Sequence, residues 1–104
     1  MNDWVRVCAA VELPLGAMRA AHVGGRNVVV CRTEHGVHAL DDLCTHADAR
    51  MTDGRFRGTR LVCPLHGAAF DCRSGSVLAG PAATALRTHE ARIANDVVEV
   101  RVAS

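Results

Sequence analysis

Two short motifs of the sequence each contain one cysteine and one histidine, Cys44-Thr45-His46 and Cys63-Pro64-Leu65-His66. Sixteen residues, 47–62, separate the two motifs, and each motif follows a segment of strand-like composition. Two loops can therefore each present one sulfur and one imidazole nitrogen to a shared site. Thiolate and imidazole bind zinc, copper and iron, whereas magnesium and calcium prefer oxygen ligands. The two motifs therefore predict a metal centre.

The order of the four residues bears on which metal they bind. Zinc fingers usually pair like with like, two cysteines followed by two histidines, whereas cysteine and histidine alternate in this sequence. Alternation fits a two-iron site in which both cysteines bind one iron and both histidines bind the other. A zinc-stabilised β-sheet binding module is the alternative from another class of function. Colour separates the two, because a brown protein with iron and acid-labile sulfide excludes zinc.

The surroundings of both motifs resemble the Rieske [2Fe–2S] proteins. The segment 63–71, CPLHGAAFD, is similar to the second cluster loop of that family, and the segment 39–46 looks like the first. Three dipeptides at the family's positions extend the match: Asp53-Gly54, Ser74-Gly75 and Gly80-Pro81. The resemblance runs from about Trp4 to Val102, and it is to a free-standing Rieske ferredoxin.

The resemblance implies one Rieske-type [2Fe–2S] cluster and a role for each motif residue. Cys44 and Cys63 would bind one iron through sulfur, and His46 and His66 the other through Nδ1. Neutral histidines in place of thiolates raise the reduction potential above that of an all-cysteine cluster. In the surrounding loops, Gly67 and Gly75 would allow close backbone approach and positive φ, and Pro81 would stiffen a covering loop.

Rieske proteins of respiratory and photosynthetic complexes carry groups that raise the potential, and this sequence lacks them. Their loop disulfide would fall at Ala49 and Leu65, and their serine and tyrosine hydroxyls at Ala68 and Phe70. The chain contains no tyrosine at all. We therefore expect a midpoint potential near the bottom of the Rieske range of roughly −150 to +300 mV.

A low-potential Rieske ferredoxin resembles the ferredoxin component of bacterial aromatic-ring-hydroxylating dioxygenase systems. In such systems a flavin-dependent reductase oxidises NAD(P)H, the ferredoxin carries single electrons, and a terminal oxygenase reacts with O₂ at a non-haem iron. No Rossmann-type glycine fingerprint is present, so we expect a carrier that is not an enzyme by itself, and a monomer. The alternative within the family is the small subunit of an NAD(P)H nitrite reductase.

Length and charge predict one domain, residues 1–104, with cluster-binding loops at about 41–58 and 63–85. Apolar residues make up 49% of the chain, which is ordinary for a globular protein. The twelve basic residues are all arginine and face eleven acidic ones, a balance that indicates neither a nucleic-acid nor a membrane partner. The N-terminus lacks the pattern of a secretory signal, so we expect a cytoplasmic protein.

The elements that position the motifs are expected to be short antiparallel strands. Strand-like segments occur at 4–8, 18–23, 27–32, 36–40, 60–62, 68–71, 87–93 and 97–102. Gly24-Gly25 and Asn95-Asp96 predict tight hairpin turns, and one helical turn is expected near Pro14 to Met18. The predicted class is all-β, a Rieske fold with an antiparallel sandwich or barrel-like base and a small cluster-binding subdomain made of two loops.

Several charged and spare residues have a simple interpretation. Four arginines near the first loop, with Asp48 and Asp53, are most simply a solvated rim: Arg50, Arg55, Arg57 and Arg60. The functional hypothesis is that they tune docking to the reductase or the oxygenase, beside a contact patch of His46, His66 and Pro81. Three cysteines are expected as buried apolar side chains, with the third partly exposed: Cys8, Cys31 and Cys72. Four histidines are expected to be surface or structural residues: His22, His35, His38 and His89.

Overall fold

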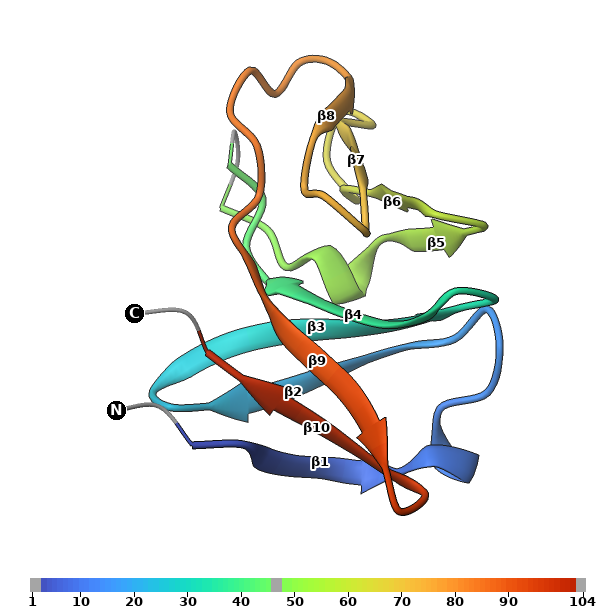
Figure 1. Cartoon of the computed structure of the whole chain (residues 1–104). Helices are drawn as coiled ribbons and strands as arrows, with labels where there is room; N and C mark the ends of the chain where they lie inside the picture. Colours follow the sequence, from blue (N-terminus) through green and yellow to red (C-terminus); the bar gives the residue numbers. More distant parts are fainter. Residues whose placement is uncertain (1–2, 46–47, 103–104) are drawn as a thin grey trace.

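The computed structural model describes residues 3–45 and 48–102 and contains two antiparallel sheets (Figure 1). The larger sheet has the order β1-β10-β9-β4-β3-β2, with β1 (Val5–Ala9), β2 (Met18–Val23), β3 (Arg26–Thr33), β4 (Gly36–Asp41), β9 (Thr88–Ala94) and β10 (Val97–Arg101). The smaller sheet has the order β5-β6-β7-β8, with β5 (Arg55–Arg57), β6 (Arg60–Val62), β7 (Ala69–Asp71) and β8 (Val77–Ala79). Two 3-10 turns complete the elements, η1 (Ala10–Glu12) and η2 (Met51–Asp53).

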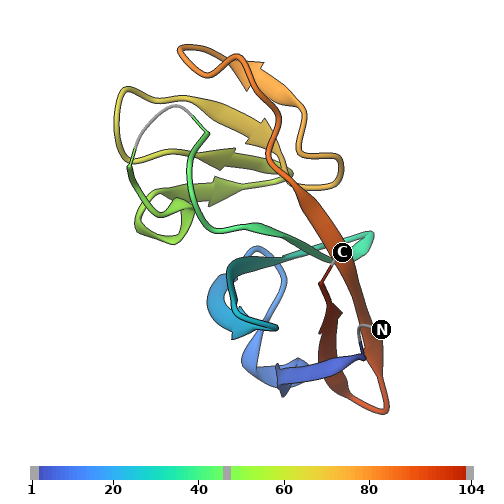
Figure 2. The ribbon, with the colours of Figure 1, turned by 90° about the vertical axis from the view of Figure 1, so that its left-hand side faces the viewer.

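The six-stranded sheet curls into a near-barrel base, and the four-stranded sheet stands on one side of it (Figure 2). The chain leaves the base after β4, builds the smaller sheet, and returns to the base at β9, which pairs with β4. The predicted all-β fold with a barrel-like base is confirmed. In the described ranges 3–45 and 48–102, no helix is long and apolar enough to cross a membrane.

Strand β3 explains how one sheet supports two hydrophobic cores. Side chains alternate between the faces of a strand, and β3 is buried on both faces. Val28 and Val30 pack with Val98 and Val100 inside the base, whereas Val29 and Cys31 pack with the residues of the smaller sheet. The uninterrupted apolar run from Val28 to Cys31 is therefore the sequence signature of a strand between two layers.

The hairpin turns of the base agree with the sequence. Gly24 and Gly25 connect β2 to β3 with φ of 57° and 78°, and Asn95 and Asp96 connect β9 to β10 with φ of 52° and 63°. Positive φ at both central residues is the mark of a type I′ turn, whose twist matches that of the flanking strands.

The helical turn expected near Pro14 to Met18 is wrong. The N–H of Ala17 donates to the carbonyl of Pro14 at 3.0 Å, and Gly16 between them has a φ of 85°. A glycine with positive φ at this position makes a type II turn, which ends the segment before a helix can form. The 3-10 turns lie at η1 and η2.

Two strands of the smaller sheet, β5 and β8, lie in segments that the sequence predicts as loops, 41–58 and 63–85. Each has only three residues, which is too short for a pattern of alternation. Both are edge strands of their sheet, and pairing with β6 and β7 rather than local preference holds them extended.

Candidate metal centre

The two motif cysteines lie side by side. Cys44 lies on the first loop, residues 42–50, and Cys63 begins the second loop, residues 63–68. Both side chains are buried, and a hydrogen bond joins them. Because the two sulfurs are adjacent and shielded from water, they fit the pair of thiolate ligands that one iron requires.

The second loop also surrounds the Cys63 sulfur with backbone. The N–H of Leu65 donates to Cys63 Sγ at 3.4 Å, and the N–H of Cys63 donates to the carbonyl of Ala68 at 2.7 Å, which closes the loop. Burial raises the pKa of the Cys63 thiol. A bound cation reverses this effect, because metal binding replaces the thiol proton.

His66 occupies the outer end of the second loop. It is exposed and has a φ of 64°, and Gly67 follows with 73°. Two successive left-handed residues reverse the chain between Cys63 and Ala68. His46 lies outside the described residues, as does any contact that it makes. In the described part of the chain, without His46, no three Cys, His, Asp or Glu side chains converge on one ion position.

The first loop is fixed by a buried carboxylate. The Asp42 side chain is 0% exposed and accepts hydrogen bonds from the N–H of Thr52 at 2.8 Å and from Thr52 Oγ1 at 2.7 Å. Arg50 Nε lies 3.4 Å from the same carboxylate. Asp42 therefore joins the end of β4 to η2, across the loop that contains Cys44. Sequence reasoning missed this role, and the only signal was a carboxylate two residues before an expected ligand.

The loop that contains Pro81 lies against the first loop. Thr45 Oγ1 donates to the carbonyl of Thr84 at 2.6 Å, and the N–H of Leu86 donates to the carbonyl of Gly75 at 2.9 Å. Pro81 itself is exposed and follows a cis peptide bond. The structure thus brings the Pro81 loop next to the candidate site.

Two glycines of the smaller sheet permit close backbone approach. A Cβ at Gly75 would collide with the carbonyl of Leu86, and Gly75 also has a φ of 77°. A Cβ at Gly54 would collide with the carbonyl of Val62, one residue before Cys63. Gly67 has positive φ but open space around it. Positive φ is thus confirmed at both Gly67 and Gly75, and close backbone approach is confirmed at Gly75. Gly54 is a position that sequence reasoning used only for resemblance.

Replacement of Gly54 by alanine is expected to destabilise the protein by about 1–3 kcal/mol, because an added methyl group in a filled space forces backbone shifts. Here the shift displaces Val62 and with it Cys63, so cluster content should fall together with the thermal midpoint. The matched control is Gly80→Ala, where the added Cβ meets nothing within 4 Å. Equal midpoints for the two variants would contradict the prediction.

The two positions that lack hydroxyls are buried beside the cysteine pair. Ala68 and Phe70 are both 0% exposed, and they belong to the same core as Cys44 and Cys63. Ala69, between them, is buried but lies outside that core. Ala68 and Phe70 therefore share a core with the cysteine pair and carry no O–H donor.

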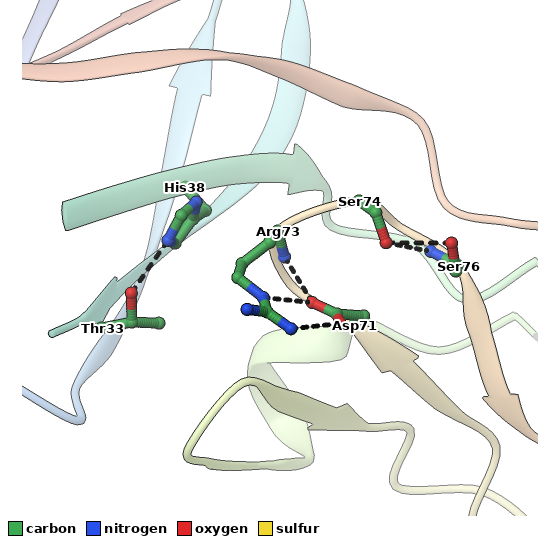
Figure 3. Close-up of polar contacts among 6 residues, drawn as sticks. All are labelled: Thr33, His38, Asp71, Arg73, Ser74 and Ser76. Atoms are coloured by element: carbon green, nitrogen blue, oxygen red, sulfur yellow. Dashed lines mark hydrogen bonds and ion pairs between the residues drawn. The ribbon is translucent and has the colours of Figure 1, made fainter. Parts of the chain in front are cut away.

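The turn after β7 lies near β4 of the base, and Figure 3 shows polar groups of both segments. Arg73 folds back onto Asp71, and its Nη2 lies 3.1 Å from Asp71 Oδ2. On the facing β4, His38 Nε2 is 2.9 Å from Thr33 Oγ1. Burial, followed by the positive charge of Arg73, lowers the pKa of His38. His38 is therefore a structural residue at the junction of the two sheets.

The remaining histidines and cysteines largely agree with the simple interpretation. His89 Nε2 lies 2.7 Å from Asp41 Oδ1 in the interior, and His22 contacts Asn27 on the surface. Cys8 and Cys31 are buried as expected. The expected partial exposure of Cys72 is wrong, because Cys72 is 0% exposed. A hydrogen bond to Cys72, together with burial, raises the pKa of Cys31, so the Cys31 thiol stays protonated in the core.

Comparison with known proteins decides the family. The Rieske [2Fe-2S] domain matches residues 3–90. The chain belongs to the Rieske family. It carries one Rieske-type [2Fe–2S] cluster, which the adjacent buried sulfurs of Cys44 and Cys63 fit. Membership of the Rieske family also favours an iron–sulfur protein over the alternative of a zinc-stabilised β-sheet binding module.

Relatives of this Rieske domain match over nearly the whole chain. The ferredoxin component of the naphthalene 1,2-dioxygenase system of Pseudomonas aeruginosa is 34% identical and covers 88% of each chain. The ferredoxin of carbazole 1,9a-dioxygenase from Nocardioides aromaticivorans is 31% identical, with a TM-score of 0.92 over 96% of this chain and 98% of that one. A complex of reduced oxygenase and oxidised ferredoxin in carbazole 1,9a-dioxygenase contains a chain that is 31% identical, with a TM-score of 0.88 over 94% and 92%.

Proposed function

We propose that this Rieske domain is a one-electron carrier that takes electrons from an NAD(P)H-dependent flavin reductase and passes them to a terminal Rieske non-haem iron oxygenase. The pair of buried sulfurs at Cys44 and Cys63, in a chain whose relatives are ferredoxin components over almost their whole length, is the observation that carries the proposal. Those relatives are electron-transfer subunits and not catalytic ones. The proposal includes a cytoplasmic location, in keeping with a donor that uses NAD(P)H.

Four residues are proposed to hold the cluster, which accepts and releases one electron when bound. Cys44 and Cys63 bind one iron, and His46 and His66 bind the other. The Leu65 N–H that points at Cys63 Sγ stabilises negative charge on that sulfur. His66, on the exposed end of its loop, is the proposed exit point for the electron.

The proposed contact patch surrounds that exit point and consists of His46, His66 and Pro81. Three leucines near the loops are exposed: Leu43 by 52%, Leu65 by 45% and Leu78 by 45%. Small and transient interfaces are typical of electron carriers, and a few apolar side chains around a redox centre suit them. A related ferredoxin binds its oxygenase in a solved complex, which supports the oxygenase as one of the two partners.

The alternative of a nitrite reductase small subunit has less support. Relatives at 30% identity or more include ferredoxin components of naphthalene, 2,4-dinitrotoluene and biphenyl dioxygenase systems. No observation on the described residues favours the nitrite reductase.

Reconstitution of the electron-transfer chain tests the proposed function. Purified holoprotein is mixed with NADH, a flavin reductase and a terminal oxygenase taken from the genes that neighbour its own. We expect reduction of the cluster by the reductase and reoxidation by the oxygenase, with one electron per chain. Holoprotein that is reduced but supports only nitrite-dependent oxidation of NADH would favour the alternative instead.

The proposed low potential gives a separate prediction. A redox titration should place the midpoint near the bottom of the range of roughly −150 to +300 mV. Ala68→Ser and Phe70→Tyr should each raise it, because a donor that favours the reduced cluster by about 1.4 kcal/mol shifts a one-electron potential by about 59 mV. Ala69→Ser is the matched control, since Ala69 lies outside the core of Cys44 and Cys63, and it should leave the midpoint unchanged. A clearly positive midpoint in the unmodified protein would contradict the prediction.

A further inference from the structure

The outer face of the β5–β6 hairpin gathers three arginines. In the ladder of the two strands Arg57 lies directly opposite Arg60, and Arg55 lies opposite Val62. Since side chains alternate along a strand, these four residues share one face. Leu61 and Phe56 occupy the other face, where Leu61 is buried in the core and Phe56 packs against it. All three arginines are exposed, and the hairpin projects beside the base (Figure 1).

These arginines lack acidic partners, as do Arg6, Arg19, Arg32 and Arg87 in the described part of the chain. Arg26, Arg50, Arg73, Arg92 and Arg101 each form an ion pair with a carboxylate. Within residues 3–45 and 48–102, none of Arg55, Arg57 and Arg60 forms one. Like charges directly opposite each other destabilise a sheet, so the Arg57–Arg60 pair lowers stability in the isolated protein.

A groove runs along this arginine face to the candidate metal centre. One hollow of about 560 Å³ lies between the start of β2, at Met18, and the three arginines. A second hollow of about 440 Å³ continues from Arg55 and Val62 to Cys63 and Gly67. The two hollows share Gly54, Arg55 and Val62 as lining residues. A partner surface that occupies this groove would therefore reach Cys63, a proposed cluster ligand.

Protection of a sheet edge explains only part of this pattern. β5 is an edge strand, and charged side chains on an edge strand discourage pairing with other chains. Arg60, however, lies on β6, which is paired on both sides. An inner strand needs no such charge, so edge protection does not account for Arg60.

We propose that the arginine face, Arg55, Arg57 and Arg60, docks a carboxylate-bearing surface of the terminal oxygenase, an inference that rests on the proposed function. Guanidinium groups bind carboxylates through two parallel hydrogen bonds. Arg55 and Arg57 lie about 6.7 Å apart along β5, and Arg60 lies opposite Arg57 on β6. This spread over two strands matches several carboxylates on a protein surface better than one small anion. Of the two partners, the oxygenase is the one that a related ferredoxin binds in a solved complex.

The test is the double variant Arg57→Gln/Arg60→Gln of the holoprotein, assayed with the oxygenase that accepts electrons from the unmodified protein. These two arginines line the hollow farther from Cys63, whereas Arg55 lines both hollows, so the variant should leave the midpoint potential unchanged. We expect KM for the ferredoxin to rise about tenfold at low ionic strength with kcat preserved. The difference should shrink as salt screens the charges. Reduction by the flavin reductase should be unaltered.

The matched control is Arg6→Gln/Arg19→Gln, which removes the same charge from exposed arginines of β1 and β2. It should leave KM nearly unchanged. An equal KM for both double variants, or an effect confined to the reductase, would overturn the inference while the proposed function stands. Phosphate that inhibits more than chloride at equal ionic strength would indicate a small-anion site and overturn it too. Unmodified holoprotein that reduces no oxygenase would overturn both.

Discussion

Replacement of Cys63 by alanine is expected to yield a colourless protein, with iron and acid-labile sulfide reduced to background. The same result is expected for Cys44→Ala. The two sulfurs are buried and hydrogen-bonded to each other. After either substitution, the iron that they bind would retain only one cysteine ligand. Neighbouring water cannot replace the missing ligand, because both cysteines are shielded from solvent. Visible absorption and iron and sulfide analysis of the purified protein measure the effect.

The other three cysteines supply controls with the same chemical change. Cys8, Cys31 and Cys72 are also buried, yet their replacement by alanine should retain the cluster. Removal of a buried sulfur leaves a small cavity, which costs stability but removes no ligand. A brown Cys63→Ala protein, or loss of iron in Cys72→Ala equal to that in Cys63→Ala, would refute the proposed ligand set.

Local sequence was sufficient to predict those parts of the fold that depend on neighbours along the chain. The type I′ turns at Gly24-Gly25 and Asn95-Asp96 require residues that tolerate positive φ, and the sequence has them. The strand predicted at 97–102 forms as β10 (Val97–Arg101), and its alternating valines Val98 and Val100 are fully buried in the base core. The helical turn near Pro14 was wrong because Gly16 favours a type II turn there.

The parts that could not be predicted depend on contacts between distant segments. Strands β5 and β8 exist because β6 and β7 pair with them, and three residues carry no pattern that would indicate this. Residue types and spacing pointed to Cys44 and Cys63, and the structure brings them together. The sequence did not indicate how their loops are fixed. The space that excludes a side chain at Gly54 is filled by the carbonyl of Val62 on β6, and this contact appears only in the folded chain.

Asp42 is the residue whose loss should most disturb the site without removal of a ligand. Its buried carboxylate accepts two hydrogen bonds from Thr52, and hydrogen bonds to a charged group contribute about 1.5–3 kcal/mol each. Asp42→Ala is therefore expected to lower the free energy of unfolding by about 3–5 kcal/mol and to leave the N–H of Thr52 without an acceptor. Since Asp42 lies two residues before Cys44, cluster content should fall as well. Denaturant unfolding and iron analysis measure the two effects.

Two variants separate the hydrogen bonds of Asp42 from its ion pair. Thr52→Val removes only the Oγ1 donor and keeps the N–H, so it should cost about half as much as Asp42→Ala. Arg50→Ala should cost less than about 1 kcal/mol, because the Arg50 side chain is 51% exposed and exposed ion pairs contribute little. If Arg50→Ala destabilises the protein as much as Asp42→Ala, the ion pair holds the loop and the hydrogen bonds do not. If instead the loss of stability decreases in the order Asp42→Ala, Thr52→Val, Arg50→Ala, the first loop is held by a buried carboxylate that is hydrogen-bonded to η2. This contact then keeps Cys44 beside Cys63 before any metal binds.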